Sequence, residues 1–258
     1  MSLLEVIAAH TGDYPERVSL PELLAEQALG HLSRGHDVRT RLLVMDFFRA
    51  AVMEHDPGPS EEYVALLREN GVSRARILHD YIPTLARQLG DDWCNDDMSF
   101  VEVTCAMGHL VALARDLSFQ DFPPLAQEEE RHSILLALEP GGQHALGLII
   151  VAEKFRKAGW QVQLELDCPT VDDLAGTAAA RTCDVIGLSV GSSERIEKVA
   201  ETVARLRIAC PQSLIVLGGS IAEEYREVLL KTGVDLVLLP QDDAPAELRR
   251  HILHLRRD

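Results

Sequence analysis

The segment with the clearest chemical potential is Glu139-Pro140-Gly141-Gly142-Gln143-His144-Ala145-Leu146-Gly147. It places a histidine at the start of an expected helix and a glycine three residues later. An imidazole in such a loop can bind a metal, and Gly147 lets a bulky group approach the helix because it has no side chain. The glycine spacing is not the G-x-G-x-x-G of dinucleotide-binding turns. Two interpretations stay open: His144 is a metal ligand, or it is a solvent-exposed histidine near a helix N-terminus.

Two further segments place small or polar residues at the ends of apolar runs. Ser189 and Gly191 close one run, and the pair Gly218-Gly219 closes the next. A serine hydroxyl there can hydrogen-bond a ring nitrogen or a phosphate, and a glycine pair leaves room for a flat group. Serine is also a common helix cap, and glycine suits the turn between a strand and a helix.

The elements that carry these residues alternate between short apolar runs and helical stretches after residue 131. Strands are expected at Ser133–Leu138, Gln161–Leu166, Asp184–Val190, Leu214–Leu217 and Asp235–Leu239, and helices starting near His144, Val171, Ser193, Ile221 and Ala244. This order predicts right-handed βαβ units and a five-stranded parallel sheet. Ligands of such sheets bind outside the carboxyl ends of the strands, which is where the loops with His144, Ser189 and Gly218 are expected.

The first half of the chain shows apolar residues at helical spacing and no strand-like alternation. We expect five or six helices before residue 120, the last four forming a compact bundle. The predicted organisation is an N-terminal helical extension (1–59), a helical cap bundle (60–120) and an α/β domain (131–258). A linker around Asp121–Pro124 and Glu128–Glu130 joins the bundle to the α/β domain.

Composition limits the classes of function. The 258 residues are 47% hydrophobic and carry a formal net charge of −16, which excludes a disordered chain and disfavours direct DNA binding. A protein partner or a small ligand is favoured instead. With no basic, apolar leader and no apolar run near the about 20 residues of a membrane span, a soluble, cytoplasmic protein is expected. The five cysteines have no C-x-x-C spacing and are expected to be buried or half-buried thiols.

Taken together, the three loop segments resemble the cobalamin-binding domain shared by methionine synthase, methylmalonyl-CoA mutase, corrinoid methyltransferase proteins and cobalamin photoreceptors. That family carries D-x-H-x-x-G, S-x-L and G-G on a flavodoxin-like sheet. Here Gly142-x-His144-x-x-Gly147 has glycine for the aspartate, Ser189-x-Gly191 has lost the leucine, and Gly218-Gly219 matches fully. The resemblance implies that His144 is the lower axial ligand of cobalt. It also implies that the dimethylbenzimidazole tail, displaced from cobalt, threads past Ser189 and the glycine pair.

The resemblance extends to the segment Leu89–Ser99 of the helical region, where Trp93 is implied to cover the upper face of the corrin. Taken alone, Trp93 is more readily an ordinary core tryptophan. Light-sensing members have a Glu-His pair ten residues after this tryptophan, and Val103 and Thr104 stand there instead. An upper histidine ligand from that position is therefore absent, and His109 is the next candidate.

The whole arrangement is most similar to the AerR/PpaA proteins of photosynthetic purple bacteria. This implies a non-enzymatic regulator or photoreceptor that binds hydroxocobalamin or adenosylcobalamin and responds to light or redox state. Its implied partner is a DNA-binding transcription factor, a repressor of photosynthesis genes that it antagonises. Two alternatives stay open: a corrinoid methyl carrier of a methyltransferase system, and a heme-binding sensor on the same fold.

One departure from the family bears on these alternatives. In the methyltransferases of the family, the aspartate hydrogen-bonds the ligating histidine and tunes its basicity. Gly142 cannot supply this contact, which favours a bound cofactor that does not turn over. Glu139 is the nearest carboxylate in sequence, and the sequence leaves open whether it replaces the aspartate.

Overall fold

The computed structural model describes residues 38–118, 132–191 and 196–255. The chain divides into two compact units, with the boundary between Phe119 and Gln120. The expected linker and residues 1–37 lie outside the described residues.

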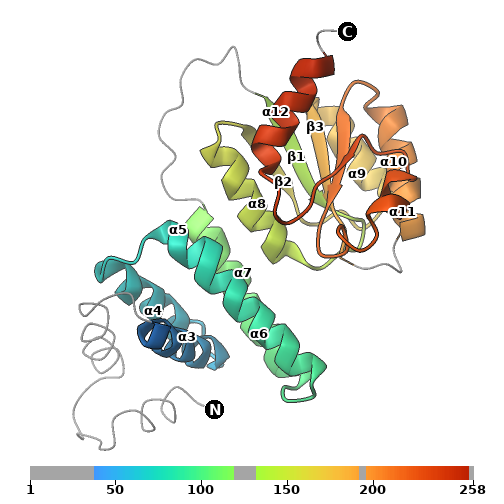
Figure 1. Cartoon of the computed structure of the whole chain (residues 1–258). Helices are drawn as coiled ribbons and strands as arrows, with labels where there is room; N and C mark the ends of the chain where they lie inside the picture. Colours follow the sequence, from blue (N-terminus) through green and yellow to red (C-terminus); the bar gives the residue numbers. More distant parts are fainter. Residues whose placement is uncertain (1–37, 119–131, 192–195, 256–258) are drawn as a thin grey trace, which may run out of the picture. The chain divides into compact units, whose positions relative to one another are not determined.

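The first unit is helical in every described element (Figure 1). Its elements are α3 (Val38–Met53), α4 (Gly58–Glu69), α5 (Arg74–Arg76), the π-helical turn η1 (Ile77–Tyr81), α6 (Ile82–Cys94) and α7 (Phe100–Ser118). Because α5, η1 and α6 follow one another without a break, residues 58–118 form three long helical segments rather than the expected four.

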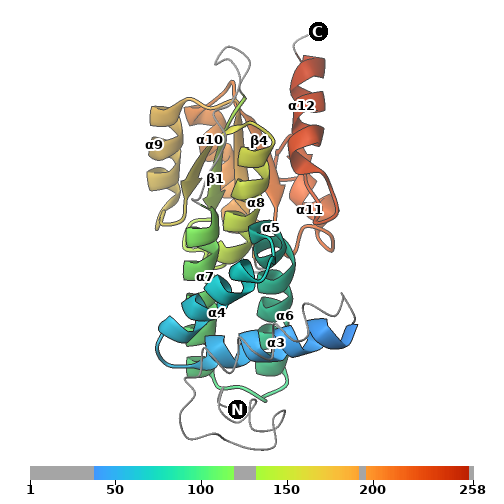
Figure 2. The same cartoon turned by 90° about the vertical axis from the view of Figure 1, so that its left-hand side faces the viewer.

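Among the described residues of this unit, α3 is a further helix, and it crosses α7 (Figure 2). Two contacts tie α3 to its neighbours: the Tyr63 hydroxyl donates to the carbonyl of Val44 at 3.0 Å, and His109 Nδ1 lies 3.0 Å from the carbonyl of Val52. The Phe48 and Tyr63 rings stack with centroids 5.9 Å apart in the core. In the described residues, the helical packing includes α3, which lies in the segment 1–59 that was expected to be an N-terminal helical extension.

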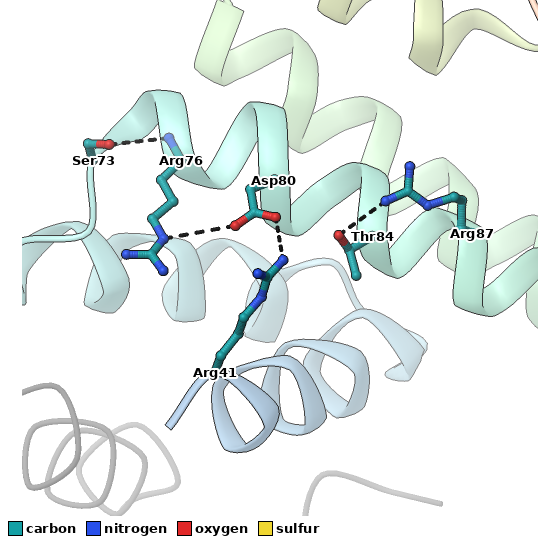
Figure 3. A network of polar contacts seen from close by, with 6 residues as sticks. All are labelled: Arg41, Ser73, Arg76, Asp80, Thr84 and Arg87. Atoms are coloured by element: carbon teal, nitrogen blue, oxygen red, sulfur yellow. Dashed lines mark hydrogen bonds and ion pairs between the residues drawn. The ribbon is translucent and has the colours of Figure 1, made fainter. Parts of the chain in front are cut away.

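Polar contacts at the surface add to this packing (Figure 3). The carboxylate of Asp80, in η1, lies 2.5 Å from the Arg41 guanidinium of α3 and 3.9 Å from that of Arg76. The Ser73 hydroxyl accepts a hydrogen bond from the Arg76 backbone at 3.2 Å and caps the helical segment. Both ion pairs are partly exposed, so each contributes at most about 1 kcal/mol.

The second unit is a five-stranded parallel sheet with the strand order β2-β1-β3-β4-β5. Its strands are β1 (Ser133–Leu138), β2 (Gln161–Glu165), β3 (Val185–Ser189), β4 (Leu214–Gly218) and β5 (Leu236–Val237). Its helices are α8 (Ala145–Lys157), α9 (Val171–Arg181), α10 (Ile196–Ala209), α11 (Arg226–Leu230) and α12 (Ala244–Leu255). This order is that of flavodoxin-like folds, and it confirms the predicted fold class.

Helices cover both faces of the sheet (Figure 1). Ile134 and Leu136 of β1 pack with α8 and α12, whereas Leu135 and Ala137 pack with α9, α10 and α11. Because both faces are buried, β1 is apolar at every interior position, as expected for a parallel sheet. β2 is only half-buried at one edge, in agreement with its alternating sequence.

Strands β2, β3 and β4 differ from their expected bounds by one residue at one or both ends, whereas α11 and β5 differ more. Residues 220–225 form turns, so α11 begins at Arg226 rather than near Ile221. Gly219 has a φ of +119°, and its carbonyl accepts the Ala222 N–H, which starts a turn in place of a helix. β5 ends early because the Leu239 N–H leaves the sheet and donates to the Asp242 carboxylate at 2.7 Å.

The cysteines divide into two groups. Cys168, Cys183 and Cys210 are buried, and burial raises the pKa of each thiol. Cys94 and Cys105 are exposed on α6 and α7, so the expectation that all five thiols are buried or half-buried is wrong for these two. Among the described helices, none has both the length and the apolar character needed to cross a membrane.

Candidate functional site

The three segments singled out in the sequence meet at one edge of the sheet. In the strand register, Leu138 at the end of β1 pairs with Ser189 at the end of β3, and Ser189 pairs with Gly218 at the end of β4. Since parallel strands end at the same edge, the loops carrying His144, Gly191 and Gly219 start side by side.

A tight turn after β1 holds the histidine segment in place. The Glu139 N–H donates to the Ser189 carbonyl at 3.2 Å, and the Glu139 carbonyl accepts the Gly142 N–H at 2.7 Å. Gly141 adopts a φ of +75° and donates its N–H to the Cys168 carbonyl at 3.3 Å. The turn is therefore fixed to the loops after β2 and β3.

His144 leaves this turn as the N-cap residue of α8, with its side chain exposed and not capping the helix. Its imidazole lies against Gly191, in the loop after β3. A Cβ atom on Gly191 would lie 2.6 Å from Cδ2 of the ring and 3.6 Å from Nε2. A larger residue at position 191 would therefore displace the imidazole from this position.

The glycine pair after β4 has a different explanation at each position. A Cβ atom on Gly219 would lie 2.2 Å from the Val190 carbonyl oxygen, and Gly219 has a φ of +119°. The loop after β3 and the loop after β4 therefore pass so close that only glycine fits at 219. A Cβ atom on Gly218 would make only an ordinary contact, 3.7 Å from the Leu238 carbonyl oxygen.

Gly147 has open space around it. It is exposed in the first turn of α8, and a Cβ atom there would meet nothing within 4 Å in the described part of the chain. No internal contact accounts for this glycine. Ser189, the other polar residue singled out at this edge, is half-buried at the end of β3.

Trp93 lies near the end of α6 in the first unit and is 49% exposed. The interpretation of Trp93 as an ordinary core tryptophan is therefore wrong. Thr104 is also exposed, and its hydroxyl donates to the Phe100 carbonyl at 2.6 Å within α7. His109 is half-buried in the bundle, where its Nδ1 contacts α3.

No group of three or more His, Cys, Asp or Glu side chains that could hold a bare metal ion occurs among residues 38–118, 132–191 and 196–255. A metal inside a macrocycle needs few protein ligands, because the macrocycle supplies the equatorial ones. One exposed imidazole beside the open space at Gly147 fits such a group. The site residues are therefore compatible with a corrin or a porphyrin.

The main residue that sequence reasoning did not place is Glu139. It is buried, with 4% of its surface exposed, and its Oε1 accepts the Gly191 N–H at 3.3 Å. The sequence feature that could have pointed to Glu139 is Gly142, because a glycine can mark a position where another group occupies the space of a side chain.

The α/β unit has relatives among known proteins. The sequence matches the B12 binding domain family over residues 133–249. It is 34% identical over 158 residues to an uncharacterized 20.5 kDa protein in the bchF-crtJ intergenic region of Rhodobacter capsulatus, covering 61% of this chain and 82% of that protein. The chain therefore belongs to the B12 binding domain family.

Two other relatives extend the comparison. The HTH-type transcriptional repressor CarH of Myxococcus xanthus is 33% identical over 163 residues, which are 62% of this chain and 52% of CarH. Among solved structures, the Methanosarcina barkeri monomethylamine corrinoid protein superposes with a TM-score of 0.61 at 14% identity, covering 82% of this chain and 99% of that one. The latter likeness concerns the fold alone.

Proposed function

We propose that this protein is a cobalamin-binding, light- or redox-responsive regulator that acts through a protein partner, as an antirepressor of photosynthesis genes. The observation that carries the proposal is the exposed His144 imidazole, seated on Gly191 at the carboxyl edge of a B12 binding domain. Cobalamin, when bound, would supply a cobalt centre that responds to light or redox state.

Each site residue has a proposed part. His144 would hold the cobalt, and Gly147 would leave space for the corrin beside α8. Ser189, Gly191, Gly218 and Gly219 line the path of the nucleotide tail. Trp93, an exposed residue of the helical unit, is a proposed cofactor contact.

The regulatory role is supported by relatives and by charge. CarH and CarA of Myxococcus xanthus are both HTH-type transcriptional repressors, and this chain spans about half of each, 52% and 46%. The formal net charge of −16 suits a basic protein partner, since complementary charge speeds association and selects partners. In the sequence, glycine in place of the family's aspartate at position 142 favoured a regulator over a methyl carrier. The structure weakens this support, because the Glu139 carboxylate lies beside position 142.

The decisive experiment is the visible absorption spectrum after incubation with hydroxocobalamin, adenosylcobalamin or hemin and removal of unbound cofactor. We expect corrin bands to be retained, and illumination of the adenosylcobalamin form to change them together with the hydrodynamic radius. A Soret band with hemin and no retained corrin would indicate a heme sensor instead. Retained corrin without a response to light or reductant, in a chain that accepts methyl groups from a methyltransferase, would indicate a carrier.

Replacing Gly147 with alanine tests whether this glycine serves cofactor binding rather than the stability of the free protein. Without cofactor the variant should be more stable by about 0.5–1 kcal/mol, because alanine is favoured over glycine within a helix and the space is open. Cobalamin binding should weaken, because the added methyl group enters the space proposed for the corrin. Urea denaturation of the free protein and titration with hydroxocobalamin measure the two effects. Unchanged cobalamin affinity would contradict this placement of the corrin.

A further inference from the structure

The turn between α6 and α7 leads into two large apolar side chains that face solvent (Figure 1). Phe100 is 69% exposed and Val101 is 68% exposed, both in the first turn of α7. A single apolar side chain on a surface is common, whereas adjacent ones of this exposure keep a continuous apolar surface in water. Such a surface is a candidate for binding another molecule.

Hydrogen bonds within the turn hold these two side chains in place. The Ser99 hydroxyl accepts the Glu102 N–H at 3.3 Å, and the Glu102 carboxylate accepts the Ser99 N–H at 2.9 Å, which makes a capping box at the start of α7. The Asp97 N–H donates to a carbonyl of α6 at 2.9 Å, and the Met98 side chain is buried. Because the turn is already ordered, its backbone loses little freedom when a partner covers the apolar side chains.

The charge around the two apolar side chains is negative. Residues 88–114 contain no lysine or arginine, and their exposed carboxylates are Asp91, Asp96, Asp97 and Glu102. Hydrogen bonds with Ser99 hold the pKa of Glu102 below its usual value, so this carboxylate is ionised at neutral pH. Asp92, the fifth acid of the segment, forms an ion pair with Arg49 of α3. A partner that covers this apolar surface therefore meets four exposed negative charges, which favour a basic partner.

We propose that Phe100, Val101 and the four exposed carboxylates form a docking surface for a lysine- or arginine-rich protein segment that carries an apolar side chain. That apolar side chain packs on Phe100 and supplies most of the affinity, because buried aromatic anchors dominate interfaces. The carboxylates pair with the cations of the partner and select basic partners over acidic ones. The inference rests on the proposed function, because a DNA-binding transcription factor presents clustered lysine and arginine side chains. Trp93, proposed above as a cofactor contact, is not part of this surface.

The test measures how tightly a fluorescein-labelled helical peptide of lysine and leucine binds the full chain, by fluorescence anisotropy. Phe100→Ser is compared with Ile208→Ser, a matched change at a side chain of α10 that is 75% exposed. We expect Phe100→Ser to weaken peptide binding at least about fivefold. Ile208→Ser should bind as the wild type does, and both variants should keep the wild-type melting temperature. Equal losses in the two variants, or wild-type binding in Phe100→Ser, would overturn the proposal.

The contribution of charge is measured with Asp97→Asn, against Asp167→Asn at an exposed carboxylate after β2. Asp97→Asn should weaken peptide binding about 1.5- to 5-fold at low salt, as expected for one exposed ion pair. The loss should shrink at high salt, because salt screens exposed charges. Asp167→Asn should have no effect. Equal effects at the two positions would show that the peptide responds only to the net charge of the chain, and this result would overturn the proposal.

A titration with hydroxocobalamin separates this inference from cofactor binding. Phe100→Ser should bind hydroxocobalamin as the wild type does, because the docking surface needs no cofactor. Lost cobalamin affinity together with unchanged peptide binding would make Phe100 a cofactor contact and overturn the inference. A wild-type chain that retains no corrin but binds the peptide through Phe100 contradicts only the cobalamin part of the proposed function.

Discussion

Replacing His144 with alanine abolishes the retention of cobalamin after desalting, if the imidazole is the protein's ligand to cobalt. The loss should exceed the about 10- to 100-fold that removing an outer partner of a metal ligand costs. The fold should be unaffected, because His144 is exposed and does not cap α8. Absorption spectra after desalting and thermal unfolding of the free protein measure the two effects. Corrin bands that survive unchanged in this variant would remove His144 from the metal.

Gly191→Ala should displace the His144 imidazole without changing the chemistry of that side chain. The new methyl group would lie 2.6 Å from the ring carbon Cδ2, which is too close, so the ring must leave its seat. We expect retention of cobalamin to fall nearly as far as in His144→Ala. The double variant should be no worse than His144→Ala alone, because both changes remove one interaction. A double variant in which the two losses add would show that Gly191 acts on the cofactor by another route.

Gly219→Ala has the largest expected effect on stability. Alanine is strained at a φ of +119°, and its Cβ atom would lie 2.2 Å from the Val190 carbonyl oxygen, a backbone atom that cannot move without shifting the loop after β3. We expect a loss of about 2–5 kcal/mol in the free energy of unfolding. Because a single domain is stable by only about 5–15 kcal/mol, much of the second unit's stability would be lost.

The adjacent Gly218→Ala is the control for this effect. Its Cβ atom makes only an ordinary contact, 3.7 Å from the Leu238 carbonyl oxygen. Its free energy of unfolding should therefore change by less than about 1 kcal/mol. Urea denaturation of both variants without cofactor measures the difference. Equal losses in the two variants would show that the close approach at Val190 does not limit this position.

The sheet was predictable because its signal is local. Ile134–Ala137 are apolar without interruption, which suits a strand inside the sheet, whereas Gln161–Glu165 alternates, which suits an edge strand. The structure has β1 inside the sheet and β2 at its edge. The segment after Gly219 carries helix-forming residues, but the backbone of Gly219 and its contact with Val190 decide its conformation. A contact between residues distant in sequence leaves no periodic pattern, so the start of α11 was misplaced.

The position of the candidate residues at one edge of the sheet was predictable, whereas the local reasons for the glycines were less so. The sequence located His144, Gly191 and Gly219 correctly at one edge of the sheet, but it explained the glycines by the ligand. The backbone of Val190 requires a glycine at position 219, and Gly191 leaves room for the His144 imidazole. Gly142 was interpreted as the loss of a carboxylate. The turn of Glu139 back over Gly142 depends on tertiary contacts with Ser189 and Gly191, which the order of residues does not show.

The two borders of the sheet have a consequence for how the protein behaves at high concentration. An edge strand with unpaired backbone N–H and C=O groups can pair with a strand from another molecule and begin aggregation. Here β5 offers only two residues, and β2 ends in Glu165, which Arg181 holds at 3.3 Å. Edge strands that are short or carry charged side chains pair poorly with a strand from another molecule. The sheet should therefore stay at five strands even when the protein is crowded.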